Sequence, residues 1–209
     1  MSLQAEPFAD PATSREEIFR ATYVAHIEHG FTDLSIQQIA DEATLSKSTI
    51  YHHFDGKQHL LMEYARELLE WYIDEILLDP AGDPVTRLEW SLDLVFLGET
   101  ANGITLDDIR PEGLDCVYLG LRTQAARNPE IKEYFDNVDR MARERLATLI
   151  EQGIEEGSLR DVNPDHVAAT LYVILEGGLY LRSTGSDTEW LGHAREMLDA
   201  YLDTLKTDD

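Results

Sequence analysis

The chain has 209 residues, with 41 Asp and Glu against 17 Lys and Arg and a formal net charge of −24 at pH 7. Its single cysteine excludes an internal disulfide and a cysteine-rich zinc site, and it fits a reducing cytoplasm. No stretch approaches the roughly eighteen consecutive apolar residues of a membrane-spanning helix, and residues 1–11 lack the basic start and apolar run of a signal peptide. We therefore expect a cytoplasmic protein without a membrane partner.

Residues 1–12 are polar and contain two prolines, which predicts a disordered tail. Residues 14–29 follow as the first predicted helix. A hydroxyl at Thr13 or Ser14 with a glutamate three residues later is typical of a capping box, and Gly30 is suited to end the helix. We expect this helix to pack behind the next two, because two short helices alone bury too little surface to be stable.

Residues 35–54 predict two short helices joined by a tight turn. The first has an apolar stripe at helical spacing, formed by Ile36, Ile39, Ala40 and Ala43, and Ser35 with Gln38 predicts a capping box at its start. Ser46 can cap the second helix, in which Ile50 and Phe54 point inward. The outward positions combine one lysine with hydroxyls and aromatic rings: Lys47, Ser48, Thr49, Tyr51, His52 and His53. This pattern is typical of a helix-turn-helix.

The segment LSKSTIYHHFDGKQHLL, residues 45–61, closely resembles the recognition helix and following turn of TetR-type transcriptional regulators. The similarity runs from about Thr13 to Leu78, and beyond it only the helical layout is alike. Thr44 and Ser48 stand where this family often has glycine. A β-branched residue is unfavourable in the left-handed conformation that ends many helices, so the detail of the turn at Thr44 is the least typical part of the motif.

The rest of the chain also reads as helices, which together with the resemblance implies an all-α fold. We expect a three-helix DNA-binding domain over residues 13–56, a connecting helix over 57–78, and a C-terminal bundle for ligand binding and dimerisation over 79–209. The boundary is the Pro- and Gly-rich segment 79–84. Within the bundle, helices are expected to start near Pro84, Pro111, Pro129, Pro164 and Ser186, the last of these capped by Ser186 with Glu189.

The resemblance and the outward positions on the predicted second motif helix imply the residues that contact double-stranded DNA. Phosphate contacts are expected from Lys47, Tyr51, His52 and Lys57, with help from Ser35 and Ser46 near helix starts. Ser48 and Thr49 are the candidates for contacts with base edges. For Tyr51 the alternative is packing against the helix 14–29.

Residues 167–181 form a nearly uncharged helical segment in which Glu176 is the sole charged residue. A helix that is apolar all round must be covered on several sides. One side can contact its own domain and the other a second copy, with Gly177 and Gly178 allowing close approach. We expect a homodimer whose interface contains Leu146, Leu149, Ile150, Leu171, Ile174, Gly178 and Leu181. The alternative is a central core helix in a monomer.

A small-molecule effector is also implied by the resemblance, because TetR-like regulators commonly bind one inside the C-terminal bundle. The candidate pocket combines aromatic rings with a few polar groups: Trp90, Leu94, Phe96, Tyr118, Tyr172 and Glu176. The alternative for this set is an ordinary hydrophobic core. Glu176, in its apolar surroundings, is expected either to pair with an arginine such as Arg122 or Arg143 or to receive a cationic group of a ligand.

Motifs of catalysis, metal binding or nucleotide binding are absent from the sequence, so we expect no enzyme activity, cofactor or metal. The favoured function is a repressor that binds a palindromic operator as a dimer and is released by a ligand. Two other hypotheses are a helical interaction protein without DNA binding and a helical-bundle enzyme that uses the C-terminal cavity.

The acidic balance is unusual for a DNA-binding protein. Residues 14–62 contain four Lys and Arg against seven Asp and Glu, a balance of −3, so −21 of the total charge of −24 lies outside the DNA-binding segment. Only four of the seventeen basic residues are lysines. We interpret this composition as adaptation to a very salty cytoplasm; the alternative is an ordinary solvated acidic surface.

Overall fold

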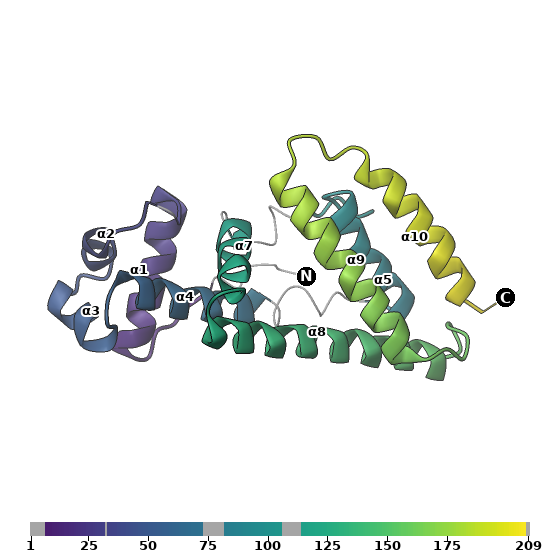
Figure 1. Ribbon diagram of the computed structural model, residues 1–209, viewed down its shortest axis with the longest axis horizontal. Coiled ribbons are helices and arrows are strands. Elements are labelled where there is room, and N and C mark those ends of the chain that lie inside the picture. Colours follow the sequence, from purple (N-terminus) through teal and green to yellow (C-terminus); the bar gives the residue numbers. More distant parts are fainter. Residues whose placement is uncertain (1–6, 32, 73–81, 106–113, 208–209) are drawn as a thin grey trace. The chain divides into compact units, whose positions relative to one another are not determined.

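The structure is a computed structural model that describes residues 7–31, 33–72, 82–105 and 114–207 (Figure 1). Within these ranges the regular structure is helical and no strand is present, which confirms the predicted all-α class. The helices are α1 (Ser14–His29), α2 (Ile36–Glu42), α3 (Lys47–His53), α4 (Lys57–Tyr72), α5 (Pro84–Phe96), α7 (Leu114–Ala125), α8 (Pro129–Glu155), α9 (Pro164–Thr184) and α10 (Leu191–Leu205).

These helices divide into two compact units. The first contains α1 to α4 and the α7 residues up to Leu121, and the second contains α5, α8, α9, α10 and the end of α7 from Arg122. The predicted domain limits at residues 12, 56 and 78 stay predictions. The last part of the expected connecting helix, the first half of the boundary segment 79–84 and the expected helix start at Pro111 lie outside the described residues.

In the first unit, side-chain caps start the helices where the sequence predicts them. Thr13 and Glu16 form a complete capping box at the start of α1. Ser35 caps α2 by accepting a hydrogen bond from the Gln38 backbone N–H at 3.2 Å. The Gln38 side chain does not complete the predicted box, because its Oε1 accepts a hydrogen bond from the Ser35 hydroxyl at 2.6 Å. The hydroxyl cap alone therefore fixes this helix start.

An aromatic core holds the first unit together. The rings of Phe19 and Phe54 lie 5.7 Å apart, and Tyr64 of α4 is fully buried beside Phe19. The Arg15 guanidinium lies over the rings of Phe19 and Phe54, 5.2 and 5.0 Å from their centroids. Since Phe54 ends α3, this packing sets the position of that helix relative to α1 and α4.

Phe8 of the N-terminal segment packs on the aromatic core of the first unit. The Phe8 ring lies 5.7 Å from the ring of Phe19 and 5.9 Å from that of Tyr64, and Pro7 is buried. Pro7 and Phe8 therefore pack on the first unit, and the extent of the predicted disordered tail over residues 1–12 stays a prediction. The polar composition indicated a tail, but burying the apolar ring of Phe8 against Phe19 and Tyr64 is favourable.

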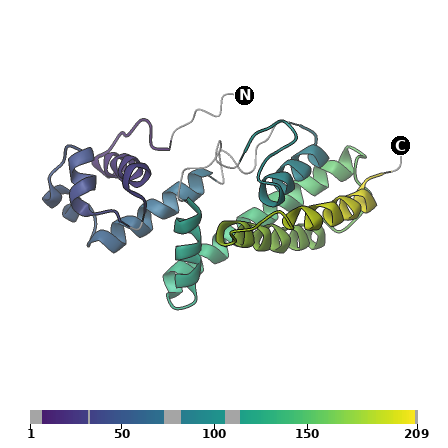
Figure 2. The same ribbon diagram turned by 90° about the horizontal axis from the view of Figure 1, so that it is seen from above.

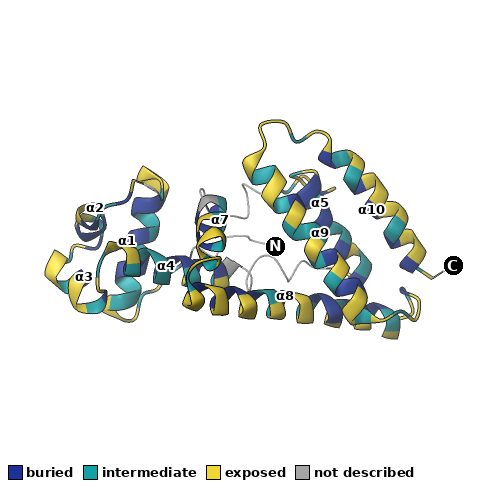
Figure 3. Ribbon diagram, in the orientation of Figure 1, coloured by how far each residue is buried: buried dark blue, intermediate teal, exposed yellow. Residues whose placement is uncertain are grey.

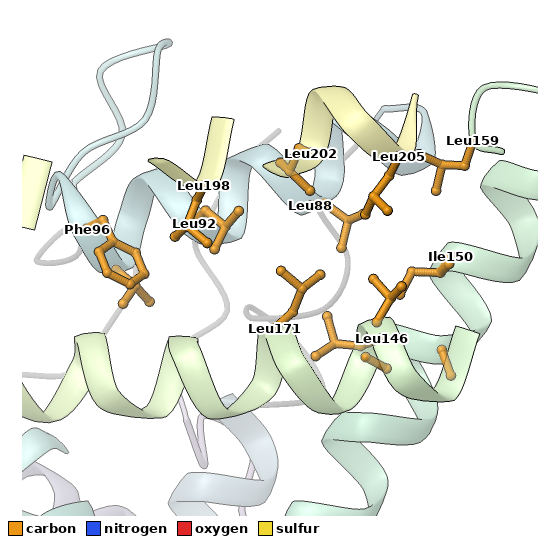
Figure 4. Close-up of a cluster of buried hydrophobic side chains, with 14 of the residues drawn as sticks. Leu88, Leu92, Phe96, Leu146, Ile150, Leu159, Leu171, Leu198, Leu202 and Leu205 are labelled. Atoms are coloured by element: carbon orange, nitrogen blue, oxygen red, sulfur yellow. The ribbon is translucent and has the colours of Figure 1, made fainter. Parts of the chain in front are cut away.

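In the second unit, α5 packs against α8, α9 and α10, and its leucines lie between the other helices (Figure 4). The helices expected near Pro84, Pro129 and Pro164 begin there, capped by Asp83, Asn128 and Asn163. The predicted cap of the last helix is wrong: α10 begins at Leu191, after Trp190, without a side-chain cap. The buried cluster consists of Leu88, Leu92, Val95, Phe96, Leu146, Ala147, Ile150, Leu159, Val167, Ala168, Leu171, Leu191, Leu198, Leu202 and Leu205.

Ion pairs add to this core along one side of α10. The buried Arg195 guanidinium pairs with Asp93 of α5 at 2.8 Å, and Lys206 pairs with Glu89 of α5 at 2.9 Å. Two partners from successive turns of α5 thus hold α10 against it.

Among the described residues no helix is long and apolar enough to cross a membrane.

Candidate nucleic-acid interface

The start of α3 is built by one hydroxyl with three partners. Ser46 Oγ accepts a hydrogen bond from the Thr49 backbone N–H at 3.2 Å and lies 2.7 Å from Ser48 Oγ and 2.9 Å from Thr49 Oγ1. The first turn of the helix therefore presents a connected set of hydroxyl groups, each able both to donate and to accept. Such groups suit phosphate oxygens and base edges.

The two faces of α3 differ in burial as the motif requires (Figure 3). Ile50 and Phe54 are buried in the first unit, whereas Lys47, Ser48 and His52 are exposed. The Tyr51 side chain keeps 55% of its surface exposed, so it points away from the core rather than packing against α1. The outward face thus carries a cation, hydroxyls and a phenol.

The turn before α3 places Thr44 in a conformation that usually favours glycine. Thr44 has a φ of +51°, in the left-handed region that few side chains adopt. Behind it, the Leu45 N–H donates to the Ala40 carbonyl at 3.2 Å and closes the end of α2. The β-branched Thr44 therefore stores local backbone strain of about 1–2 kcal/mol in this turn.

The remaining predicted DNA contacts lie at other helix starts of the same unit. Lys57 is the exposed first residue of α4, and Ser35 is the half-buried cap of α2. Between α3 and α4, the Asp55 backbone N–H donates to His59 Nδ1 at 3.1 Å. Most of the eight predicted residues are exposed, while Ser35 and Thr49 are half-buried; the hydrogen bonds described above join only Ser46, Ser48 and Thr49 directly.

One histidine of the first unit lies in the interior of that unit. His26 of α1 is buried, its Nδ1 shares a 2.9 Å hydrogen bond with the Tyr64 hydroxyl, and its Nε2 is buried without a hydrogen-bond partner. Burial lowers the pKa of His26 to about 4. The sequence analysis gave this residue no role, because its burial depends on residues 38 positions away.

The residues of the predicted effector pocket belong to both compact units, and the pocket stays a prediction. Leu94 and Phe96 are buried in the chain, and Tyr118 belongs to the other compact unit. Trp90 and Tyr172 are half-buried. The polar members behave differently: Glu176 pairs with Arg122 at 3.3 Å, which confirms the expected arginine partner, and the Tyr172 hydroxyl donates to Asp139 at 2.8 Å. Burial and the nearby Glu176 carboxylate raise the pKa of Tyr172 well above its ordinary value.

Most residues of the predicted dimer interface serve the core of one copy. Leu146, Ile150, Leu171 and Gly178 are buried within the chain, and this part of the interface prediction is corrected. The apolar spacing identified the inner face of α9 but not which helix covers it. Leu149 and Ile174 are half-buried and Leu181 is exposed, so these three remain available to a partner.

The exposed apolar surface lies elsewhere on α9 and on α10, both of which pack against α5 (Figures 1 and 2). Val173 and Met197 are 70% and 71% exposed, and Tyr180 and Trp190 are about half exposed. An open groove of about 370 Å³ lies between the two helices, lined by Thr170, Ile174, Ala194, Met197, Leu198 and Tyr201. The sequence analysis missed the α10 half of this surface, although its amphipathic spacing was a usable signal.

A capped second helix with a hydrogen-bonding outer face, packed on a helical core, defines a helix-turn-helix DNA-binding protein. The family described as bacterial regulatory proteins, tetR family, matches residues 18–64, and the C-terminal domain of BetI-type transcriptional repressors matches residues 104–206. The chain belongs to the TetR family of DNA-binding transcriptional regulators. This family is not a class of enzymes.

Similar proteins agree over almost the whole length. The HTH-type transcriptional repressor AcnR of Corynebacterium glutamicum is 24% identical over 95% of this chain and 96% of its own. A TetR transcription regulator from Haloarcula marismortui is 33% identical, with a TM-score of 0.69 over 93% of this chain and 98% of that chain. A putative transcriptional regulator from Saccharomonospora viridis, crystallised with choline, is 24% identical, with a TM-score of 0.65 over 93% and 98%.

Proposed function

We propose that this regulator is a repressor that binds a palindromic operator as a homodimer and leaves it when a small molecule binds the C-terminal unit. The observation that carries the DNA-binding part is the exposed, hydrogen-bonding face of α3, held by the Ser46 cap and the buried Ile50 and Phe54. The names of relatives such as AcnR support repression rather than activation.

On the operator, α3 lies in the major groove. Lys47, Tyr51, His52 and Lys57 contact phosphates, with Ser35 and Ser46 near the helix starts, because these groups are donors at or near the surface. Ser48 and Thr49 read base edges. Ser46 joins both hydroxyls, so the pair reaches the bases already oriented, with less side-chain freedom to lose.

The second copy covers the groove between α9 and α10. An exposed stripe runs along α9 at helical spacing through Thr170, Val173, Gly177, Tyr180 and Thr184. Apolar side chains such as Val173 and Met197 at the centre of such a surface are typical of interfaces. A dimer places two recognition helices on half-sites about 34 Å apart, which a palindromic operator matches.

The C-terminal match to BetI-type repressors and the choline bound to the Saccharomonospora relative support an organic cation as the effector. The protein acts in the cytoplasm, where its operator is. Its acidic balance of −24 and its likeness to a Haloarcula protein support a salty cytoplasm.

Recovery of operator DNA tests the proposal. The full-length protein is mixed with sheared DNA of its own genome in KCl buffer, bound fragments are sequenced, and the enriched site is footprinted. We expect a palindrome with half-sites about one helical turn apart and a two-to-one ratio of chains to DNA. Enrichment of no sequence over a Lys47→Ala, Tyr51→Ala double variant would favour the helical interaction protein without DNA binding.

A further inference from the structure

Side chains of the second unit from α8 and α9 meet at the guanidinium of Arg122, near the end of α7. Its Nη1 donates to Asp139 Oδ1 of α8 at 2.7 Å, and its Nη2 donates to Glu176 Oε2 of α9 at 3.3 Å. Its Cζ lies over the Phe135 ring, 4.7 Å from the centroid. One cation is thus held by two carboxylates and the face of an aromatic ring.

The surroundings of Arg122 are those that proteins offer to a small organic cation. An aromatic face with adjacent carboxylates attracts guanidinium and quaternary ammonium groups. The Tyr172 hydroxyl donates to Asp139 at 2.8 Å and fixes that carboxylate towards the guanidinium. Asp139 and Glu176 together carry two formal negative charges, and Arg122 carries one formal positive charge between them.

We propose that Arg122 is the internal occupant of an organic-cation site formed by Phe135, Asp139, Tyr172 and Glu176, and that a small guanidinium or quaternary ammonium compound displaces it. This assignment rests on the proposed function, because it names the site and the chemical class of the effector. No open cavity is needed, since the space that the ligand fills is the space that the Arg122 head group leaves.

The exposure of these groups makes the exchange feasible. The side chains of Arg122, Asp139 and Glu176 keep 29%, 28% and 27% of their surface accessible, so a small cation reaches the carboxylates from solvent and the guanidinium can turn out into water. Arg122 is attached to the chain and competes with the ligand for the same carboxylates. The apparent affinity for the ligand is therefore the intrinsic affinity multiplied by the fraction of time for which Arg122 leaves the site vacant. The effector therefore binds weakly, at concentrations typical of accumulated solutes.

Displacement of Arg122 also changes what holds α7. Asp139 and Glu176 attach this side chain to α8 and α9, and the division between the two compact units falls directly before Arg122. A bound cation takes over both carboxylates and removes these two attachments of α7. Ligand binding in the bundle thereby reaches a helix whose earlier residues belong to the DNA-binding unit.

Calorimetry on the full-length protein without DNA tests the site, with agmatine as the guanidinium probe and choline as the quaternary ammonium probe at constant KCl. We expect binding with a dissociation constant in the millimolar range, and about tenfold tighter binding by Arg122→Met, which vacates the site. Glu176→Gln and Phe135→Leu should each weaken binding about five- to tenfold. The matched control is Arg140→Met, which removes an arginine–carboxylate pair within α8, Arg140 with Glu144, and should leave binding unchanged.

Equal affinities of wild type and Arg122→Met for both probes, or no binding by either protein up to about 10 mM, would overturn the proposal. If Arg122→Met melts at a much lower temperature than wild type, the Glu176→Gln and Phe135→Leu variants are used instead. Binding of the probes by these two variants that is as tight as binding by wild type would then overturn the proposal. Operator affinity is measured separately without cations, so that failure of the cation site is distinguished from failure of the proposed DNA-binding function. Cation binding that leaves operator affinity unchanged supports the site and removes only the release by ligand.

Discussion

Gly178 of α9 faces Phe96 of α5 within one copy of the chain, so closely that a Cβ atom added at Gly178 would lie 2.7 Å from Phe96 Cζ. Its neighbour Gly177 is exposed, and a Cβ added there would meet no atom within 4 Å. Two adjacent glycines thus have different roles: Gly178 allows α9 to approach α5, and Gly177 lies in the exposed stripe proposed for the dimer.

We therefore expect opposite results from the same substitution at the two positions. Gly178→Arg forces a side chain into a filled core and should lower the free energy of unfolding by at least about 3 kcal/mol. Gly177→Arg should preserve the melting temperature of the monomer but weaken self-association. Analytical ultracentrifugation with thermal melting checks both variants, and an intact dimer in Gly177→Arg would place the interface off this stripe.

Lys47→Ala should weaken operator binding for all DNA sequences alike, since a phosphate contact carries no sequence information. The slope of log affinity against log salt should fall in magnitude by about one. Tyr51→Ala should weaken binding without altering helicity, because the side chain is exposed. Fluorescence anisotropy over a KCl series measures both, with the exposed Lys132→Ala of α8 as the control. Affinities of Lys47→Ala and Tyr51→Ala equal to that of the control would refute these contacts.

The first unit should lose stability as the solution is acidified, because of His26. Burial lowers the pKa of His26 in the folded state to about 4, below the unfolded value of about 6.5. A lowered histidine pKa means that the unfolded state takes up the proton first, so stability is full above pH 6.5 and falls towards pH 4. The loss amounts to about 2 kcal/mol at pH 5.

Urea denaturation at pH 7.5 and pH 5 measures this loss. His26→Phe should reduce the pH dependence, whereas His193→Phe, at an exposed position of α10, should not. The same pH dependence in wild type and His26→Phe would show that other groups are responsible.

Thr44→Gly should stabilise the protein, by up to about 1 kcal/mol, because glycine adopts the left-handed conformation of this turn without strain. Thr44→Ala is the matched control: it removes the β-branch but keeps a Cβ atom, and we expect a smaller gain. Chemical denaturation of both variants supplies the comparison. A destabilised Thr44→Gly would mean that the exposed threonine side chain contributes more than the strain costs.

Added salt should stabilise this protein. Its charge of −24 repels itself in dilute buffer, and at about 1 M KCl the Debye length of roughly 3 Å screens that repulsion. We expect the melting temperature to rise between about 0.1 and 2 M KCl and operator binding to persist near the upper end, since few lysines and arginines displace counterions from DNA. A melting temperature that stays flat or falls would identify the acidic residues as an ordinary surface.

The sequence by itself determined those parts of the protein that depend on neighbours within a few residues. The caps at Thr13, Ser35, Ser46, Asn128 and Asn163 are hydrogen bonds across three residues or fewer, so a local pattern predicts them. The helix-turn-helix and its outward face follow from the same local spacing, and the all-α class follows from helical periodicity without alternating strands.

Only the tertiary structure decided which neighbour each apolar face meets. Periodicity marks a face of α9 as apolar, but the contact of Gly178 with Phe96, 82 residues earlier, makes that face core rather than interface. Phe8 on Tyr64, His26 with Tyr64, and Arg122 with Glu176 likewise join residues 38 or more positions apart. Such contacts depend on how the helices pack together, and no pattern within a single helix determines that packing.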